Sequence, residues 1–323
     1  MDLCSLGSAD REALAPLVSA HPYSDYRNHR AFPKRDQDRI LLGQIQRAAE
    51  QDHVVGVKEG DRILGLATLS AMPWDSGIFG LPMARIGPLI VPAQGHPRAP
   101  LVHRLLDGLL EVARAEGVRH VSTRVDCADV DAIHALERSG FRLMECLVTH
   151  VIQPVRDPLP PAKRLFPVRA YRPEDRDALV AIAQQMFPQL QSRFSADPDL
   201  PPEGAVRFYV EWTKNICSGE MADHVLVAEK RGRPIGFLAC KGNTDVRNWT
   251  GIRIAGQSLS ASHPEGTGSY IGLLNEIHAV GREAGYDFME AEGPLHHPVV
   301  VRTWQRYGWF LARAKYAFHR GLG

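Results

Sequence analysis

The feature that most constrains this chain is an internal repeat. Four landmark residues of the first half recur in the same order in the second half, at an offset of about 168 residues. The first and second landmarks are 13 positions apart in both halves, and the third and fourth are 23 positions apart. The matching pairs are Asp52 and Asp223, Gly65 and Gly236, Gly117 and Gly285, and Gly140 and Gly308. A repeat of this length indicates a duplicated domain rather than a short solenoid unit.

The length of 323 residues agrees with two domains. We place the boundary in a proline-rich stretch at 153–167, because such composition favours an extended connector. The predicted domains are therefore 1–155 and 165–323.

The bulk properties argue against several classes of protein. The net charge is +1 and the basic residues are scattered, which argues against a nucleic-acid partner. No apolar run approaches the roughly 18 residues of a membrane span, and the N-terminus lacks the features of a secretory signal. The five cysteines form no CxxC motif, and no His and carboxylate spacing resembles a metal site. We expect a cytoplasmic protein with free thiols and no metal.

Both halves show the same order of hydrophobic patterns: helix, helix, hairpin, strand, helix, strand, helix, strand. The hairpins turn at Gly60 and Gly232, between apolar strands. Leu101, Leu105 and Leu109 are spaced for one face of an amphipathic helix. The sequence thus predicts an α/β (α+β) fold of two tandem domains, each with a mixed central sheet flanked by helices.

A glycine-containing loop precedes the amphipathic helix of the second copy. It runs from His263 through Gly266 and Thr267 to Gly268. Two glycines let the backbone approach a ligand, and the amides at a helix N-terminus favour an anion such as a pyrophosphate. The first copy has Pro97 and Ala99 at the places of the two glycines. Because proline has no N–H to donate, we expect the first copy to bind an anion less well.

These residues resemble the GNAT superfamily of acyl-CoA-dependent N-acetyltransferases, over nearly the whole chain and in both copies. The pattern His263-x-x-Gly266-x-Gly268 is similar to the loop of that superfamily, and Gly140-Phe141 and Gly308-Trp309 match its closing Gly-Phe. Trp74-Asp75-Ser76 with Phe79, and Phe208-Tyr209 with Trp212, resemble sugar-nucleotide N-acetyltransferases of the TDP-fucosamine acetyltransferase kind. The resemblance implies that the C-terminal domain binds acetyl-CoA or another acyl-CoA. It also implies that the N-terminal domain is degenerate and shapes the acceptor site.

The sequence departs from this family at one position. Many members carry a tyrosine four residues before the glycine of the Gly-Phe pair, where it protonates the departing CoA thiolate. Here Trp304 stands in the second copy and Leu136 in the first. We assign Trp304 to the cofactor-binding set, and Tyr307, three residues on, could supply the phenol from nearly the same helix face.

The reaction needs a base, a polarised carbonyl and an acceptor site. In this fold a strand amide polarises the thioester carbonyl, which points to Ser258, Leu259 and Ser260. Glu290 and Glu292 share one strand face, and Glu292 is our choice of base. His296, in the next loop, is a candidate proton relay. The candidate acceptor-binding residues, for which packing between the domains is the competing interpretation, are Trp74, Asp75, Phe79 and Trp212.

Three hypotheses follow. The first is transfer of an acetyl or other acyl group from a CoA thioester to the amine of a small molecule, such as an amino sugar nucleotide. The second keeps the transfer but takes the acyl group from a carrier protein or an aminoacyl-tRNA. The third is a non-catalytic ligand-binding protein with the same fold. The sequence leaves the acceptor and the oligomeric state open, a homodimer included.

Overall fold

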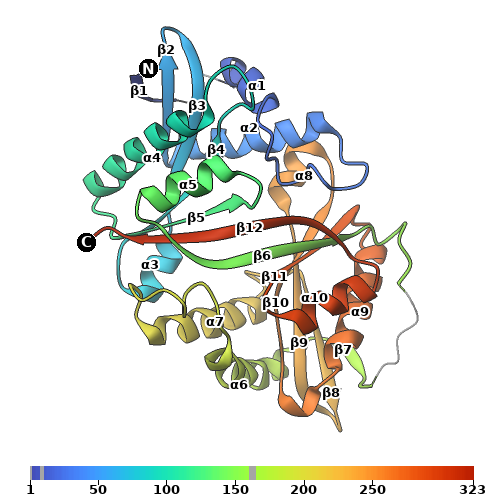
Figure 1. Cartoon of the computed structure of the whole chain (residues 1–323). Coiled ribbons are helices and arrows are strands. Elements are labelled where there is room, and N and C mark those ends of the chain that lie inside the picture. The colour runs from blue at the N-terminus through green and yellow to red at the C-terminus, as the bar shows by residue number, and fades with distance from the viewer. Residues whose placement is uncertain (1, 8–10, 160–164) are drawn as a thin grey trace. The chain divides into compact units, whose positions relative to one another are not determined.

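The computed structural model describes residues 2–7, 11–159 and 165–323 (Figure 1). The chain divides into two compact units. Unit 1 extends to Leu147 and also contains Arg313–Gly323, whereas unit 2 is Val148–Ala312.

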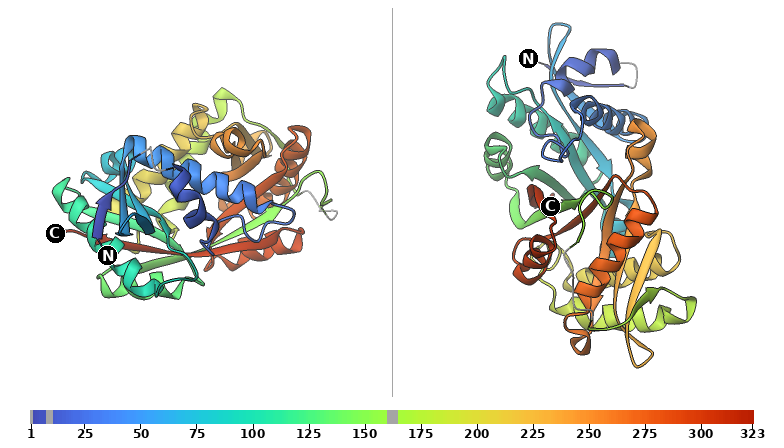
Figure 2. Two further views of the ribbon diagram at one scale, coloured as in Figure 1. Left: turned by 90° about the horizontal axis from the view of Figure 1, so that it is seen from above. Right: turned by 90° about the vertical axis from the view of Figure 1, so that its right-hand side faces the viewer.

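Unit 1 is a mixed sheet with helices on both faces (Figure 2). Its strand order is β1-β2-β3-β4-β5-β12-β6. The strands are β1 (Asp2–Ser5), β2 (His53–Glu59), β3 (Arg62–Ala71), β4 (Met83–Ile90), β5 (His120–Asp126), part of β6 (Arg142–Ile152) and most of β12 (Phe310–Gly321). The helices are α1 (Arg11–Ser19), α2 (Lys34–Gln51), α3 (Pro73–Phe79), α4 (Arg98–Ala115) and α5 (Val130–Arg138).

The alternation of side chains along the strands produces two cores in unit 1. Val54 and Leu66 pack with α1 and α2, whereas their neighbours Val55 and Ala67 pack with α4. Successive side chains of a strand point to opposite faces, so the two groups of helices cover opposite faces of the sheet. Three layers result, as the sequence predicts.

Unit 2 repeats this arrangement. Its strand order is β6-β11-β10-β9-β8-β7. Its further strands are β7 (Val168–Ala170), β8 (His224–Lys230), β9 (Arg233–Gly242), β10 (Ile254–Ser262) and β11 (Phe288–Pro294). Its α-helices are α6 (Arg176–Met186), α7 (Pro202–Cys217), α8 (Thr244–Thr250), α9 (Ser269–Glu283) and α10 (Pro298–Arg306). Three short 3-10 turns are η2 (Pro173–Asp175), η3 (Phe187–Gln189) and η4 (Pro264–Gly266).

The helices α6 and α7 cover one face of the unit 2 sheet. Val227, Phe237 and Leu259 point into the core beneath them. The helix α9 packs against β8 and β9. Its buried side chains, such as Leu273 and Leu274, form the amphipathic stripe that the sequence predicts.

The last strand of the chain completes the sheet of unit 1. The strand β12 pairs antiparallel with β5, with Phe318 opposite Thr123. Phe318 and Leu322 are buried in the same core as the leucines of α4. Conversely, β6 begins in unit 1 and its last residues belong to unit 2, where β6 is the neighbour of β11. The units therefore differ from the predicted ranges 1–155 and 165–323 at these two strands.

The predicted fold class is confirmed, and the predicted order of elements occurs, with further short elements, in both halves of the sequence. The sequence interpretation missed α3 and α8, the short helices that follow each hairpin. The strand β10 begins only at Ile254 and does not include Gly251. Gly251 instead ends α8 in a left-handed conformation, which a glycine adopts without strain.

Phe318→Ala should destabilise unit 1, although Phe318 lies in the second half of the sequence. Its side chain is 1% exposed, and removing a buried phenyl ring costs about 3–5 kcal/mol. Hydrogen exchange should show faster exchange of the α4 and β5 amides and little change in α6. Leu274→Ala, buried in unit 2, is the control and should give the reverse pattern. Faster exchange in unit 2 for Phe318→Ala would contradict the assignment of β12 to unit 1.

Candidate functional site

In unit 2, the parallel strands β10 and β11 pair over a short stretch and then separate. The paired residues are Ile254 with Phe288, Ala255 with Met289, and Gly256 with Glu290. At the point of separation β10 contains a bulge. Gln257 lies opposite Cys240 and Leu259 opposite Ala239, which leaves Ser258 between them outside the ladder with β9. A bulged residue keeps a backbone amide that the ladder does not use.

The loop 263–268 follows β10 and leads directly into α9. A Cβ atom on Gly266 would lie 2.6 Å from the carbonyl oxygen of Ile235, so only glycine fits against β9 here. Gly268 has φ +87°, a conformation that costs other L-residues about 1–2 kcal/mol. The Gly-x-Gly spacing thus has a structural reason at both positions.

The side chains of this loop stabilise its own turns. A ring nitrogen of His263 accepts the Glu265 N–H at 3.2 Å, and the Thr267 hydroxyl donates to the Pro264 carbonyl at 2.8 Å. The first N–H groups of α9 have no acceptor within the helix, and the positive end of the helix dipole lies there. An anion at this loop would therefore meet backbone N–H groups, with His263 and Thr267 fixing the loop around it.

Two cations from the β8–β9 hairpin lie beside the loop. The Glu265 carboxylate is 3.5 Å from the Lys230 ammonium and 3.7 Å from the Arg233 guanidinium. All three side chains are partly exposed, so the pairs contribute little to stability. Their effect is to place positive charge next to the loop.

A partly buried hydrogen-bond chain connects the start of α9 to the bulge. The indole N–H of Trp304 donates to the Tyr270 hydroxyl at 2.7 Å, and this hydroxyl donates to the Gln257 amide oxygen at 3.0 Å. The Gln257 amide nitrogen donates in turn to the Ser260 hydroxyl at 2.9 Å. Burial raises the pKa of Tyr270 to about 12. The tryptophan at the position of the family tyrosine is therefore in direct contact with a phenol from another helix.

The end of β6 contributes one residue to each face of the unit 2 sheet. The Thr149 hydroxyl donates to a Glu292 carboxylate oxygen at 3.1 Å. The next residue, His150, packs its ring on Trp304, with ring centroids 5.1 Å apart. Neighbouring strand residues point to opposite faces, so Glu292 and Trp304 lie on opposite faces of the sheet. The position of Gly293 supports this assignment of faces, because a Cβ atom on Gly293 would lie 3.0 Å from the Trp304 ring.

His150 is buried without polar contacts. It is 1% exposed, and neither ring nitrogen has a hydrogen-bond partner within the described part of the chain. Burial lowers the pKa of His150 to about 4. The ring is therefore neutral at physiological pH and acts as an apolar surface against Trp304.

Within the described part of the chain, the side chains of the other predicted catalytic residues of unit 2 make no hydrogen bond to this hydrogen-bond chain. His296 is exposed, and a nitrogen of its ring is 3.0 Å from the Gln191 carbonyl oxygen. Tyr307 follows the last residue of α10 and is buried. Their catalytic roles stay predictions.

The residues predicted to polarise the thioester carbonyl have different environments. Ser258 is the bulged residue, and its hydroxyl oxygen is buried. Leu259 packs into the core beneath α6 and α7. Ser260 points to the opposite face, where it accepts from Gln257. The bulge makes the Ser258 amide the best placed of the three backbone donors.

The predicted acceptor residues are divided between the units. Trp74, Asp75 and Phe79 belong to α3 of unit 1, and Asp75 and Phe79 are buried there. Trp212 belongs to unit 2, where its ring stacks on Tyr209 at a centroid distance of 6.3 Å and packs against the α6–α7 core. Part of the Trp212 ring is therefore structural. A shared role of these residues in acceptor binding stays a prediction.

Unit 1 has an ion pair where unit 2 has its glycine loop. Arg98, which corresponds in sequence to Thr267, donates to both oxygens of Asp129 at 2.8 and 2.7 Å. It also donates to the carbonyls of Val91 and Pro92, just after β4. Asp129 follows β5, so this side chain connects the ends of the two parallel strands. A buried carboxylate here disfavours a phosphate.

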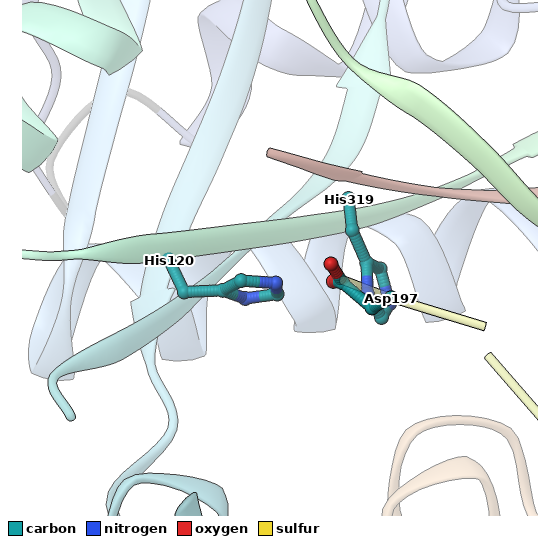
Figure 3. A group of neighbouring side chains, drawn as sticks. All are labelled: His120, Asp197 and His319. Atoms are coloured by element: carbon teal, nitrogen blue, oxygen red, sulfur yellow. The ribbon is translucent and has the colours of Figure 1, made fainter. Parts of the chain in front are cut away.

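The exchange of β12 also brings two histidines of unit 1 together. His120 begins β5 and His319 lies in β12, and their buried rings meet edge to face with centroids 5.0 Å apart (Figure 3). The sequence analysis did not predict this pair, because the two histidines are far apart in the sequence.

Sequence reasoning missed four residues of the unit 2 site. Tyr270 looked like one member of the buried stripe of its helix, and Gln257 had no pattern around it. Thr149 and His150 belong to the first copy in sequence, and only the path of β6 brings them to unit 2. The departure at Trp304 was the one available signal, because it marked a position where this chain differs from the family pattern.

Comparison with known proteins agrees with this architecture. No protein-family model matches the chain. The spore coat polysaccharide biosynthesis protein SpsD of Bacillus subtilis (strain 168) is 23% identical over 269 residues, covering 82% of this chain and 86% of that protein. A GCN5-related N-acetyltransferase from Sphaerobacter thermophilus superposes with a TM-score of 0.65 at 16% identity, over 99% of this chain and 95% of the other. A tandem GNAT protein from the clavulanic acid biosynthesis pathway gives 0.56 at 16%, over 100% and 98%.

This chain has the tandem GNAT fold. The resemblance found in the loop, the repeat and the closing Gly-Phe is thereby confirmed at the level of the fold. Among the described residues, no helix is both long and apolar enough to cross a membrane.

His150→Leu should weaken the dependence of stability on pH. The pKa of this histidine is about 4 in the folded chain and near its ordinary 6.5 when unfolded. Between these values the unfolded chain binds an extra proton, so stability falls as the pH drops. Relative to its stability at pH 7.5, the wild type should lose about 2 kcal/mol more at pH 5 than the variant. Urea unfolding at both pH values measures this difference, and equal losses in the two proteins would contradict it.

Proposed function

We propose that unit 2 transfers an acetyl group, or another acyl group, from a CoA thioester to the amine of a small molecule, an amino sugar nucleotide being the acceptor class. One observation carries the proposal. The loop 263–268, the bulge at Ser258 and the Glu292 carboxylate all lie where β10 and β11 separate. The sugar-nucleotide resemblance and the relative named for polysaccharide biosynthesis support the acceptor class.

Each part of the site has a role in this reaction. The loop and the first amides of α9 bind the pyrophosphate of the donor, with Lys230 and Arg233 nearby. The bulged Ser258 amide donates to the thioester carbonyl and stabilises the oxyanion that forms. Glu292 removes a proton from the attacking amine, and Thr149 orients this carboxylate. The acceptor then approaches from the α6–α7 face, opposite Trp304.

We assign the donor site to unit 2 alone. In unit 1, Arg98 and Asp129 connect the ends of β4 and β5, and Pro97 provides no N–H. Unit 1 would contribute to the acceptor side through Trp74 and Asp75. We place the reaction in the cytoplasm, where acyl-CoA is made and where five unpaired cysteines are stable.

Titration calorimetry with acetyl-CoA tests the donor site. The wild type should bind one molecule per chain, and Gly268→Ala should bind at least about 10-fold more weakly, because strain at φ +87° moves the loop amides. Gly219→Ala is the matched control, since Gly219 has φ +85° and open space around it. It should lose similar stability but no affinity. Failure of the wild type to bind would reject acetyl-CoA as donor.

Glu292→Gln tests the base. The variant should keep its affinity for acetyl-CoA and lose about 100-fold or more in kcat for amide formation, because a general base contributes about 10²–10⁴-fold. Release of the CoA thiol in the presence of TDP-fucosamine measures the rate. Glu290→Gln is the comparison, because Glu290 lies on the same strand face within the paired part of β11. Equal losses in both variants would remove Glu292 from the role of base.

A further inference from the structure

The proposed reaction leaves one proton unassigned. When the tetrahedral intermediate collapses, the CoA sulfur departs with a negative charge and needs a proton. The family tyrosine that would supply it is Trp304 here. Tyr307 lies just beyond the end of α10, where its backbone N–H donates to the Trp304 carbonyl at 3.1 Å, and no hydrogen bond of its hydroxyl group is found among the described residues.

Tyr270 lies at the place where that proton is needed. It is in the first turn of α9, two residues after Gly268 of the anion loop. Its hydroxyl bonds to Gln257, the first residue of β10 beyond the last pair with β11. The hydroxyl is thus fixed between the loop that would hold the pyrophosphate and the bulge that would hold the thioester carbonyl. It also lies on the face opposite Glu292, so the two proton transfers need not interfere.

We propose that Tyr270 is the catalytic acid that protonates the departing CoA thiolate, and that Trp304 is the residue that positions it. This inference rests on the function proposed above. The C–S bond breaks, the electron pair goes to sulfur, and the Tyr270 proton passes to sulfur. The resulting phenolate accepts the Trp304 N–H bond, already 2.7 Å long in the free protein. The amine proton is on Glu292, and exchange with water restores both groups.

The proton affinities of the two partners match in this environment. Burial raises the pKa of Tyr270 to about 12, so the phenol keeps its proton until a strong base forms beside it. A thiolate is also destabilised by burial. A CoA thiolate expelled beside the Tyr270 hydroxyl can therefore accept its proton.

The hydrogen bond to Tyr270 helps to fix the position of the Trp304 ring. Its ring is fixed between His150, Gly293 and the Tyr270 hydroxyl, and it is 1% exposed. In the family pattern, a tyrosine at position 304 would itself be the acid. Here the indole N–H instead supports an acid that α9 provides. The departure from the family pattern is thus compensated by a second residue.

Steady-state kinetics with acetyl-CoA and TDP-fucosamine tests the proposal in the full chain. Tyr270→Phe should lose about 100-fold in kcat while its affinity for acetyl-CoA, measured by calorimetry, changes by less than about 3-fold. Trp304→Phe, which removes the N–H donor together with part of a buried ring, should lose about 10-fold. Tyr286→Phe, another buried phenol of unit 2, is the control for loss of a hydroxyl and should keep its activity.

A conservative replacement separates acid catalysis from a structural role. Tyr270→3-fluorotyrosine keeps the hydroxyl and makes it more acidic. It should retain activity and move the alkaline limb of the kcat profile to lower pH. Full activity of Tyr270→Phe, or a loss in Tyr270→Phe that 3-fluorotyrosine does not restore, would overturn the proposal. An inactive wild type would instead reject the proposed function, and with it this inference.

Discussion

The separation of two parallel strands, β10 from β11, is the constraint on which the rest of the site depends. While two strands pair, their backbone groups satisfy each other and no ligand can enter between them. In unit 2 this pairing ends at Gly256, and the bulge at Ser258 just beyond it leaves an amide outside the ladder with β9. In unit 1, β4 and β5 also pair over only a few residues, but Arg98 and Asp129 connect their ends. The two copies thus share a fold and differ in the residues that lie between the ends of these two parallel strands.

The exchange of terminal strands gives unit 2 residues that its own half of the sequence lacks. Because the end of β6 belongs to unit 2, Thr149 meets Glu292 and His150 meets Trp304. Each of these contacts supports a residue on one face of the sheet. The end of the first half of the sequence is therefore part of unit 2, and the two units are not built from separate halves of the chain.

Much of the fold was predictable because it depends on local signals. Hydrophobic periodicity predicted the helices and strands, and the repeat predicted two similar sheets. The short helices α3 and α8 were missed, since seven residues show little periodicity. The loop glycines were assigned from spacing, and the structure gives each a steric reason. Leu259 and Trp212 show the limit of assigning site residues from sequence, because sequence alone does not distinguish a side chain in a core from one in a binding site.

The sequence by itself determined the duplication, the order of elements, the glycines of the loop 263–268 and the tryptophan at position 304. The last three depend on residues close together in the chain, and the duplication depends on spacings that recur in both halves. The tertiary structure alone decided that β12 completes unit 1 and that β6 reaches unit 2. It also decided that the Trp304 indole donates to the Tyr270 hydroxyl, because these two residues are 34 positions apart in the sequence. Strand pairing and helix packing create such contacts, and no local pattern records which partner a buried side chain will meet.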